Sequence, residues 1–105
     1  MVQEVLVKEA LAKERVEAGK ELLQRLSKTD FKVAAALWLW RLERPKWKLV
    51  VASSMVNKKG LLETYHFIDN VYGKPRPIPE LDVMDIYPME TTEPLIKALR
   101  SQARK

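Results

Sequence analysis

Basic and aromatic residues gather around one short turn near the middle of the chain. Four cations flank this turn: Arg41, Arg44, Lys46 and Lys48. Three tryptophans lie within a few residues of these cations: Trp38, Trp40 and Trp47. Cations neutralise phosphates and aromatic rings stack on bases, so this combination is typical of proteins that bind single-stranded nucleic acid. The four cations are therefore the candidate binding residues.

The same residues also have a structural interpretation. Tryptophans at alternate positions of a strand usually pack in a core, and charges at the end of a hairpin protect its edges from aggregation. Residues 61–90 carry two basic and six acidic groups, net −4, which argues against one uniformly basic face. Both interpretations stay open from the residues alone.

Acidic residues follow each other at short intervals late in the chain: Glu80, Asp82, Asp85, Glu90 and Glu93. Carboxylates near a strand end bind Mg²⁺ in many nucleases. However, no aspartate here is followed by a strand that bears Glu/Asp-x-Lys. We therefore expect ordinary loop and capping residues, and we predict no metal and no cofactor; a metal-dependent enzyme is the third-ranked alternative.

The residues for nucleophilic catalysis are sparse. His66 is the only histidine, and neither Ser53 nor Ser54 lies in a G-x-S-x-G context. The chain has three glycines and contains no G-x-G-x-x-G or phosphate-binding loop. We predict no catalytic residue, so the sequence favours a non-catalytic role.

Composition narrows the class of protein. Of 105 residues, 47% are hydrophobic and 31% charged, which fits one globular domain over residues 1–105. The absence of cysteine excludes disulfides and thiolate metal sites. The net charge of +5 is concentrated in residues 31–60, where seven basic residues stand against one acidic residue. A local field of this kind steers partners more than the total charge does.

No stretch is apolar enough for a signal peptide or a membrane helix. The uncharged runs are short: Val33 to Trp40 has eight residues and Leu49 to Asn57 has nine, against the roughly 20 residues that a spanning helix needs. We therefore expect a cytoplasmic protein without a membrane partner.

Residues 2–27 are predicted to form a long amphipathic helix. Apolar or small residues recur with helical spacing at Val5, Ala12, Val16, Gly19, Leu23 and Leu26. Gly19 costs roughly 1 kcal/mol relative to alanine inside a helix. Its place on the apolar stripe indicates a close crossing over another element.

Residues 33–43 and 47–57 are predicted to form a β-hairpin. Trp38, Trp40 and Leu42 share one face of the first strand, and both faces carry apolar residues, so cover on both sides is expected. Pro45 favours a loop of three to five residues over a tight turn of type I′ or II′. A four-residue loop would place Glu43 opposite Lys48.

Three further elements follow. A helix is predicted over 61–72, with Gly73 just beyond its end. A proline-rich connector leads to a candidate strand over 81–87, and a last helix is predicted over 93–104, with Leu95, Ile96 and Leu99 facing inward. The element order is thus α-β-β-α-β-α, an α+β fold with a three-stranded sheet. A crossover would make the third strand parallel to the second; the other edge of the sheet is the alternative.

Three segments and one glycine carry a resemblance to known proteins. They are Ala-Leu-Trp-Leu-Trp-Arg at 36–41, Trp-Lys-Leu-Val-Val-Ala-Ser at 47–53, Gly60 ahead of a tyrosine-bearing helix, and Glu-Pro-Leu-Ile-Lys-Ala-Leu-Arg at 93–100. These segments resemble a family of short uncharacterised bacterial proteins. The resemblance implies a bacterial domain of unknown function and transfers no site residue.

Three functions remain open at this point. The first is a non-catalytic binding or assembly module of a bacterial cytoplasmic system, with a protein partner or as a homo-oligomer, because the sheet carries more apolar surface than its helices readily cover. The second is nucleic-acid binding through the hairpin end. The third is the metal-dependent enzyme.

Overall fold

The computed structural model describes residues 11–43 and 45–103. Its first element is helix α2 (Lys13–Ser27). The helix ends at Ser27 as predicted, but it begins at Lys13; residues 2–10 of the predicted helix lie outside the described residues. Its buried face is Ala18, Gly19, Leu22 and Leu26. A Cβ on Gly19 would lie 3.0 Å from Cζ2 of Trp38, so the predicted close crossing is confirmed.

Strands β1 (Ala35–Arg41) and β2 (Lys46–Ala52) form the predicted antiparallel hairpin. The four residues 42–45 connect them, within the predicted loop length. Trp40 pairs with Trp47, and Leu39 pairs with Lys48. The predicted pairing of Glu43 with Lys48 is wrong, because β1 ends at Arg41 and β2 begins at Lys46.

Strand β2 ends at Ala52, five residues before the predicted end. The Ser53 side chain accepts a hydrogen bond from the Met55 N–H at 3.1 Å and caps the short helix α3 (Ser54–Lys59). Serine, which satisfies an otherwise unpaired amide of the first turn, is a preferred residue at this position. The local cap therefore competes successfully with the strand pattern over residues 53–57.

Helix α4 (Leu61–Tyr72) has the predicted bounds. It follows Gly60, whose φ of 90° favours glycine. Its buried residues are Thr64 and Ile68, whereas Leu61 and Leu62 are exposed. The two leucines at the start of the helix thus point to solvent, whereas Thr64 of the same turn points into the core.

The third strand, β3 (Ile86–Met89), starts later than predicted, because the short helix η1 (Val83–Asp85) precedes it. The Asp82 side chain caps η1 by accepting the Met84 N–H at 2.9 Å. Strand β3 is parallel to β2, in the sheet order β1-β2-β3, so the crossover topology is confirmed.

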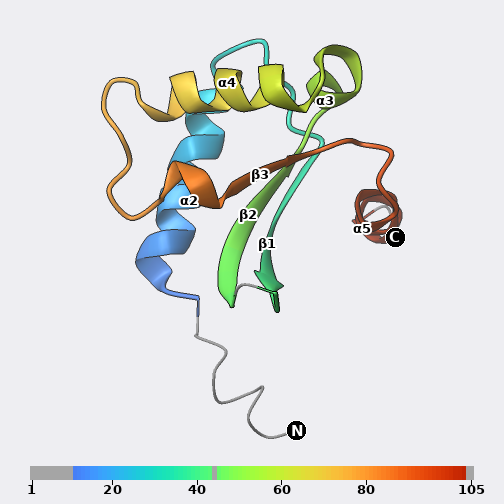
Figure 1. Cartoon of the computed structure of the whole chain (residues 1–105), viewed down its shortest axis with the longest axis horizontal. Helices are drawn as coiled ribbons and strands as arrows, with labels where there is room; N and C mark the ends of the chain where they lie inside the picture. Colours follow the sequence, from blue (N-terminus) through green and yellow to red (C-terminus); the bar gives the residue numbers. More distant parts are fainter. Residues whose placement is uncertain (1–10, 44, 104–105) are drawn as a thin grey trace, which may run out of the picture.

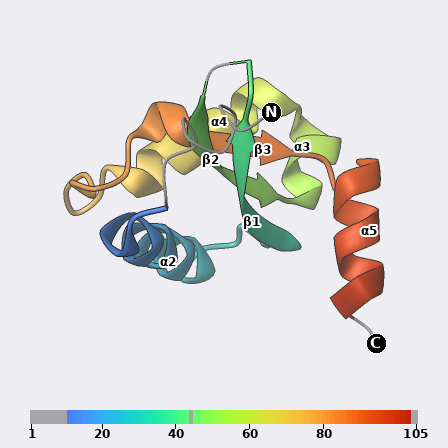
Figure 2. The same cartoon turned by 90° about the horizontal axis from the view of Figure 1, so that it is seen from below.

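Helices cover the sheet from both sides (Figures 1 and 2). Helices α2 and α4 pack on one face, over a core that includes Leu22, Leu49 and Ile68. Helix α5 (Pro94–Ala103) packs on the other face, where Ile96 meets Val50 and Ala52. Of the residues predicted to face inward on α5, Ile96 is buried and Leu99 half-buried, but Leu95 is exposed.

The described residues form four α-helices and the short helix η1, in a small α+β domain with a three-stranded sheet, as predicted. Within the described residues, no helix has the length and apolar character that crossing a membrane requires.

Candidate interaction surface

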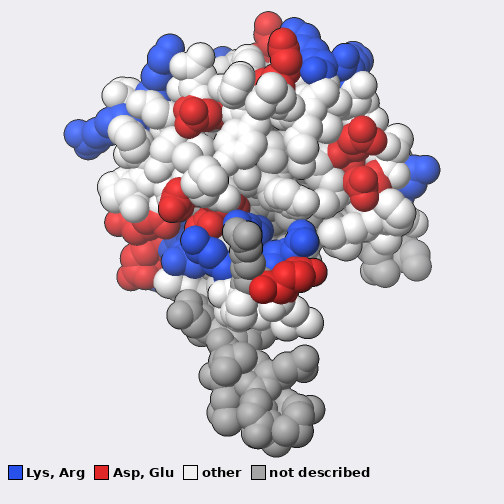
Figure 3. Space-filling view, viewed as in Figure 1, with Lys and Arg blue, Asp and Glu red and all other residues white. Residues whose placement is uncertain are grey.

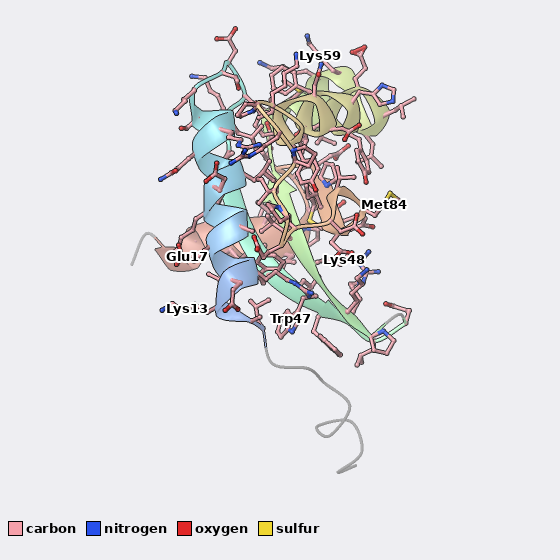
Figure 4. All side chains as sticks on the ribbon, turned by 90° about the vertical axis from the view of Figure 1, so that its left-hand side faces the viewer. Lys13, Glu17, Trp47, Lys48, Lys59 and Met84 are labelled. Carbon is pink, nitrogen blue, oxygen red and sulfur yellow. The ribbon has the colours of Figure 1, made fainter. Side chains whose placement is uncertain are left out.

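Two of the predicted binding cations converge on one buried carboxylate. Nζ of Lys46 lies 3.0 Å from Oδ1 of Asp85, and Nζ of Lys48 lies 3.6 Å from the same oxygen. The Asp85 side chain is only 5% exposed. Lys48 also donates a hydrogen bond to the carbonyl of Met84 at 3.3 Å, and Figure 4 shows these two residues on the same side of β2, opposite Trp47. The lysines therefore attach the end of the hairpin to η1.

Arg41 is also paired. Its Nε lies 3.3 Å from Oε1 of Glu43, and its guanidinium carbon lies 5.4 Å from the centre of the Tyr87 ring. The pKa of the Glu43 carboxyl is lowered, first by a hydrogen bond from its own backbone N–H and then by Arg41. Arg44, the fourth predicted cation, lies outside the described residues.

The hairpin end thus combines three described cations with two carboxylates. Figure 3 shows the blue side chains of this region flanked by red ones. Counter-charges at contact distance reduce the field that a phosphate chain would meet. The structure brings Arg41, Lys46 and Lys48 to one end of the hairpin, as the sequence indicated, and gives each of them a structural partner.

The tryptophans are half-buried. Trp38 packs against the core between α2 and the sheet. Trp40 and Trp47 form an edge-to-face pair, with ring centres 5.3 Å apart, directly across the hairpin. Such pairs add stability beyond the area that they bury. All three rings take part in packing.

The acidic residues do not form a common site. Asp82 caps η1, as expected for such a residue, whereas Asp85 is buried and ion-paired, so the prediction of an ordinary loop residue is wrong for it. His66 is exposed on α4. Among the described residues, no three histidine or acidic side chains are grouped so that they could hold a metal ion.

Backbone groups at the outer edge of β1 are the feature that side-chain motifs missed. Ser53 N–H donates to the carbonyl of Met89 in β3, and successive residues of a strand direct their peptide groups to opposite edges. Ala52 therefore faces β1, where its register partner is Ala35. The Ala52 carbonyl also accepts the N–H of Ala34, which precedes the strand, at 2.8 Å. The register then places Ala35, Leu37, Leu39 and Arg41 opposite the residues of β2 that face β1, so these four face β2.

Three peptide groups consequently point away from the sheet: those of Ala36, Trp38 and Trp40. Within residues 11–43 and 45–103, β1 pairs with β2 alone. Figure 2 shows β1 as an outer strand of the sheet. Residues 35–40 contain no charge and no proline, the features with which proteins commonly protect an edge. This β1 edge, defined by Ala36, Trp38 and Trp40, is the candidate interaction surface. In the sequence, the uncharged run from Val33 to Trp40 was the one signal that pointed to it.

The opposite edge of the sheet is protected. Because Met89 faces β2, the alternation directs the peptide nitrogen of Pro88 outward, and proline has no N–H to donate. Strand β3 also has only four residues. Prolines and short strands are typical of edges that do not accept another strand.

A cluster of exposed apolar side chains surrounds this protected edge. Leu61 is 53% exposed, Met84 68% and Tyr87 41%. Leu61 and Tyr87 line one shallow hollow of about 260 Å³, and the Tyr65 hydroxyl lies 3.7 Å from Sδ of Met84. Figure 3 shows that the face over α4 and β3 carries few charged side chains. Apolar surface is therefore also available at the edge away from β1.

Comparison with known proteins gives no relative. The chain matches no family model, no curated protein and no solved structure.

Proposed function

We propose that this chain is a non-catalytic assembly module of a bacterial cytoplasmic system, and that the β1 edge binds an extended protein segment as a fourth strand. The observation that carries this proposal is the run of outward peptide groups at Ala36, Trp38 and Trp40, without a strand partner in the described chain. Strand addition supplies backbone hydrogen bonds to just such an edge.

The surroundings of the edge support an uncharged segment as the partner. Ala36 is exposed, whereas Leu37 and Leu39 are half-buried against the cluster under α5. A strand added here would cover apolar side chains on both faces of the sheet without burying a charge. The described hairpin cations already contact carboxylates, so a polyanion is the less favoured partner.

A labelled peptide tests the proposal. The probe carries the sequence of residues 33–42 and a lysine tail for solubility, and its fluorescence anisotropy is followed at increasing protein concentration. We expect saturable binding with Kd below about 1 mM. An Ala36→Glu variant should lose most of this binding, because it places a charge on the edge, whereas Ala98→Glu, the same change at an exposed position of α5, should retain it.

Strand addition at β1 would be refuted if the peptide did not bind at the highest protein concentration. It would also be refuted if Ala36→Glu and Ala98→Glu bound the peptide equally well.

A further inference from the structure

We infer that the segment bound at the β1 edge is the β1 strand of a second copy of this chain, in an antiparallel dimer with its two-fold axis beside Trp38. This inference rests on the proposed function and names its partner. It begins from the sequence of the strand itself, which has small residues at one end and large residues at the other.

Antiparallel self-pairing matches these two ends. The alanines Ala35 and Ala36 of one copy lie opposite the bulky end of the other copy. With the axis beside Trp38, Ala36 faces Trp40 of the second copy, and each tryptophan can cover the small side chain opposite it. Pairs of small and large residues fill an interface without overlap. At the axis itself the two copies of Trp38 face each other, and each ring packs toward its own helix α2.

The same register satisfies the backbone. The outward peptide groups belong to Ala36, Trp38 and Trp40, which are symmetric about Trp38. In this alignment each outward residue faces another outward residue, so the N–H and C=O groups of the run exchange hydrogen bonds across the axis. If one strand slid by a single residue relative to the other, each outward residue would lie opposite a residue whose peptide groups already bond to β2.

Charge and packing agree with this register. Arg41 lies opposite Ala35 of the second copy, so no two cations face each other across the axis. Leu37 lies opposite Leu39 of the second copy, on the face that α5 covers. The apolar cluster of Leu37, Leu39 and Ile96 would therefore continue from one copy into the other.

The assembly closes at two copies. A β1–β1 contact uses the same surface of both chains, and it consumes that surface. Pro88 and the short length of β3 protect the remaining edge, so strand pairing does not propagate from it. The product is a closed dimer with one continuous six-stranded sheet, twice the three strands of one chain.

Sedimentation of the full chain tests the dimer. The mass should rise from 12.2 kDa toward twice that value as the concentration rises from about 1 µM to about 1 mM. Ala36→Glu should raise the dissociation constant at least about 100-fold. Ala98→Glu should leave it unchanged, since both alanines are exposed and only one lies on β1.

A spin label tests the register. The chain has no cysteine, so Leu42→Cys creates one labelling site, at a position that is 66% exposed. With the axis beside Trp38, the two labelled residues are separated by twice the four positions from 38 to 42, which corresponds to about 27 Å at about 3.4 Å per residue. Moving the axis by one residue changes this distance by about 7 Å.

A distance near 27 Å supports the inference. A distance that fits another register, or a chain that stays at 12.2 kDa throughout, overturns it. In the second case the peptide experiment separates the two proposals. A monomeric chain that still binds the β1 peptide would support strand addition and refute only self-pairing.

Discussion

The ion pairs of Asp85 make a quantitative prediction about the role of the hairpin cations. Replacing Asp85 by asparagine keeps the shape of the side chain and removes its charge. Lys46 and Lys48 then lose the carboxylate that they contact at 3.0 and 3.6 Å. If these lysines are structural, the variant should unfold more easily.

The magnitude follows from burial. Breaking a fully buried pair costs about 3–5 kcal/mol, and an exposed pair contributes about 0–1 kcal/mol. Asp85 is 5% exposed, but Lys46 is 46% and Lys48 24% exposed, so the freed ammonium groups partly regain water. We therefore expect a loss of about 1–3 kcal/mol in the free energy of unfolding, which lowers Tm by about 5–20 °C.

Urea unfolding followed by tryptophan fluorescence measures this loss. Asp82→Asn is the matched control, because Asp82 is exposed and asparagine also caps a helix. Adding Lys48→Met to Asp85→Asn should restore part of the stability, since it removes the more buried of the two unpaired cations. Equal stability of Asp85→Asn and Asp82→Asn would refute the structural role.

Three further predictions concern the core and its caps. Gly19→Ala should lower the free energy of unfolding by about 1–2 kcal/mol, because overlap with Trp38 outweighs the helix propensity gained; a more stable variant in urea would show that the ring is not packed there. Ser53→Ala should cost about 1 kcal/mol through the lost cap of α3, and an unchanged urea midpoint would contradict this. Burial raises the pKa of Tyr72 above its ordinary value of 10.0. Its contribution to stability is therefore complete below that pH and is lost as the pH rises through the folded-state pKa; ultraviolet absorbance should show late titration, and Tyr72→Phe should weaken the alkaline loss of stability.

Local patterns predicted the elements whose signals act within a few residues. The apolar spacing and the flanking glycines predicted the bounds of α4, and the two strand-like segments around Pro45 predicted the hairpin. The order of elements left the parallel crossover as one of two arrangements of the third strand, and the structure has this one. These features depend on backbone geometry that neighbouring residues determine.

Other features depend on contacts between distant parts of the chain. From the sequence, Asp85 is predicted to be an ordinary acidic residue of a loop. Only the parallel pairing of β3 with β2 brings it to the lysines of the hairpin. The short helix α3 depends on one hydroxyl, that of Ser53, within a segment of strand-like composition. The outer edge of β1 follows from the strand order, which no single motif encodes.

Hydrogen exchange at the β1 edge tests the central claim most directly. At high protein concentration, the N–H groups of Ala36, Trp38 and Trp40 should be protected to a degree similar to those of Leu37 and Leu39, which bond to β2. On dilution, or in Ala36→Glu, protection should fall at least about tenfold at the remaining outward positions and persist at the inward ones. Outward N–H groups that exchange freely at every concentration, and with the β1 peptide added, would contradict the assignment of this edge as a binding surface.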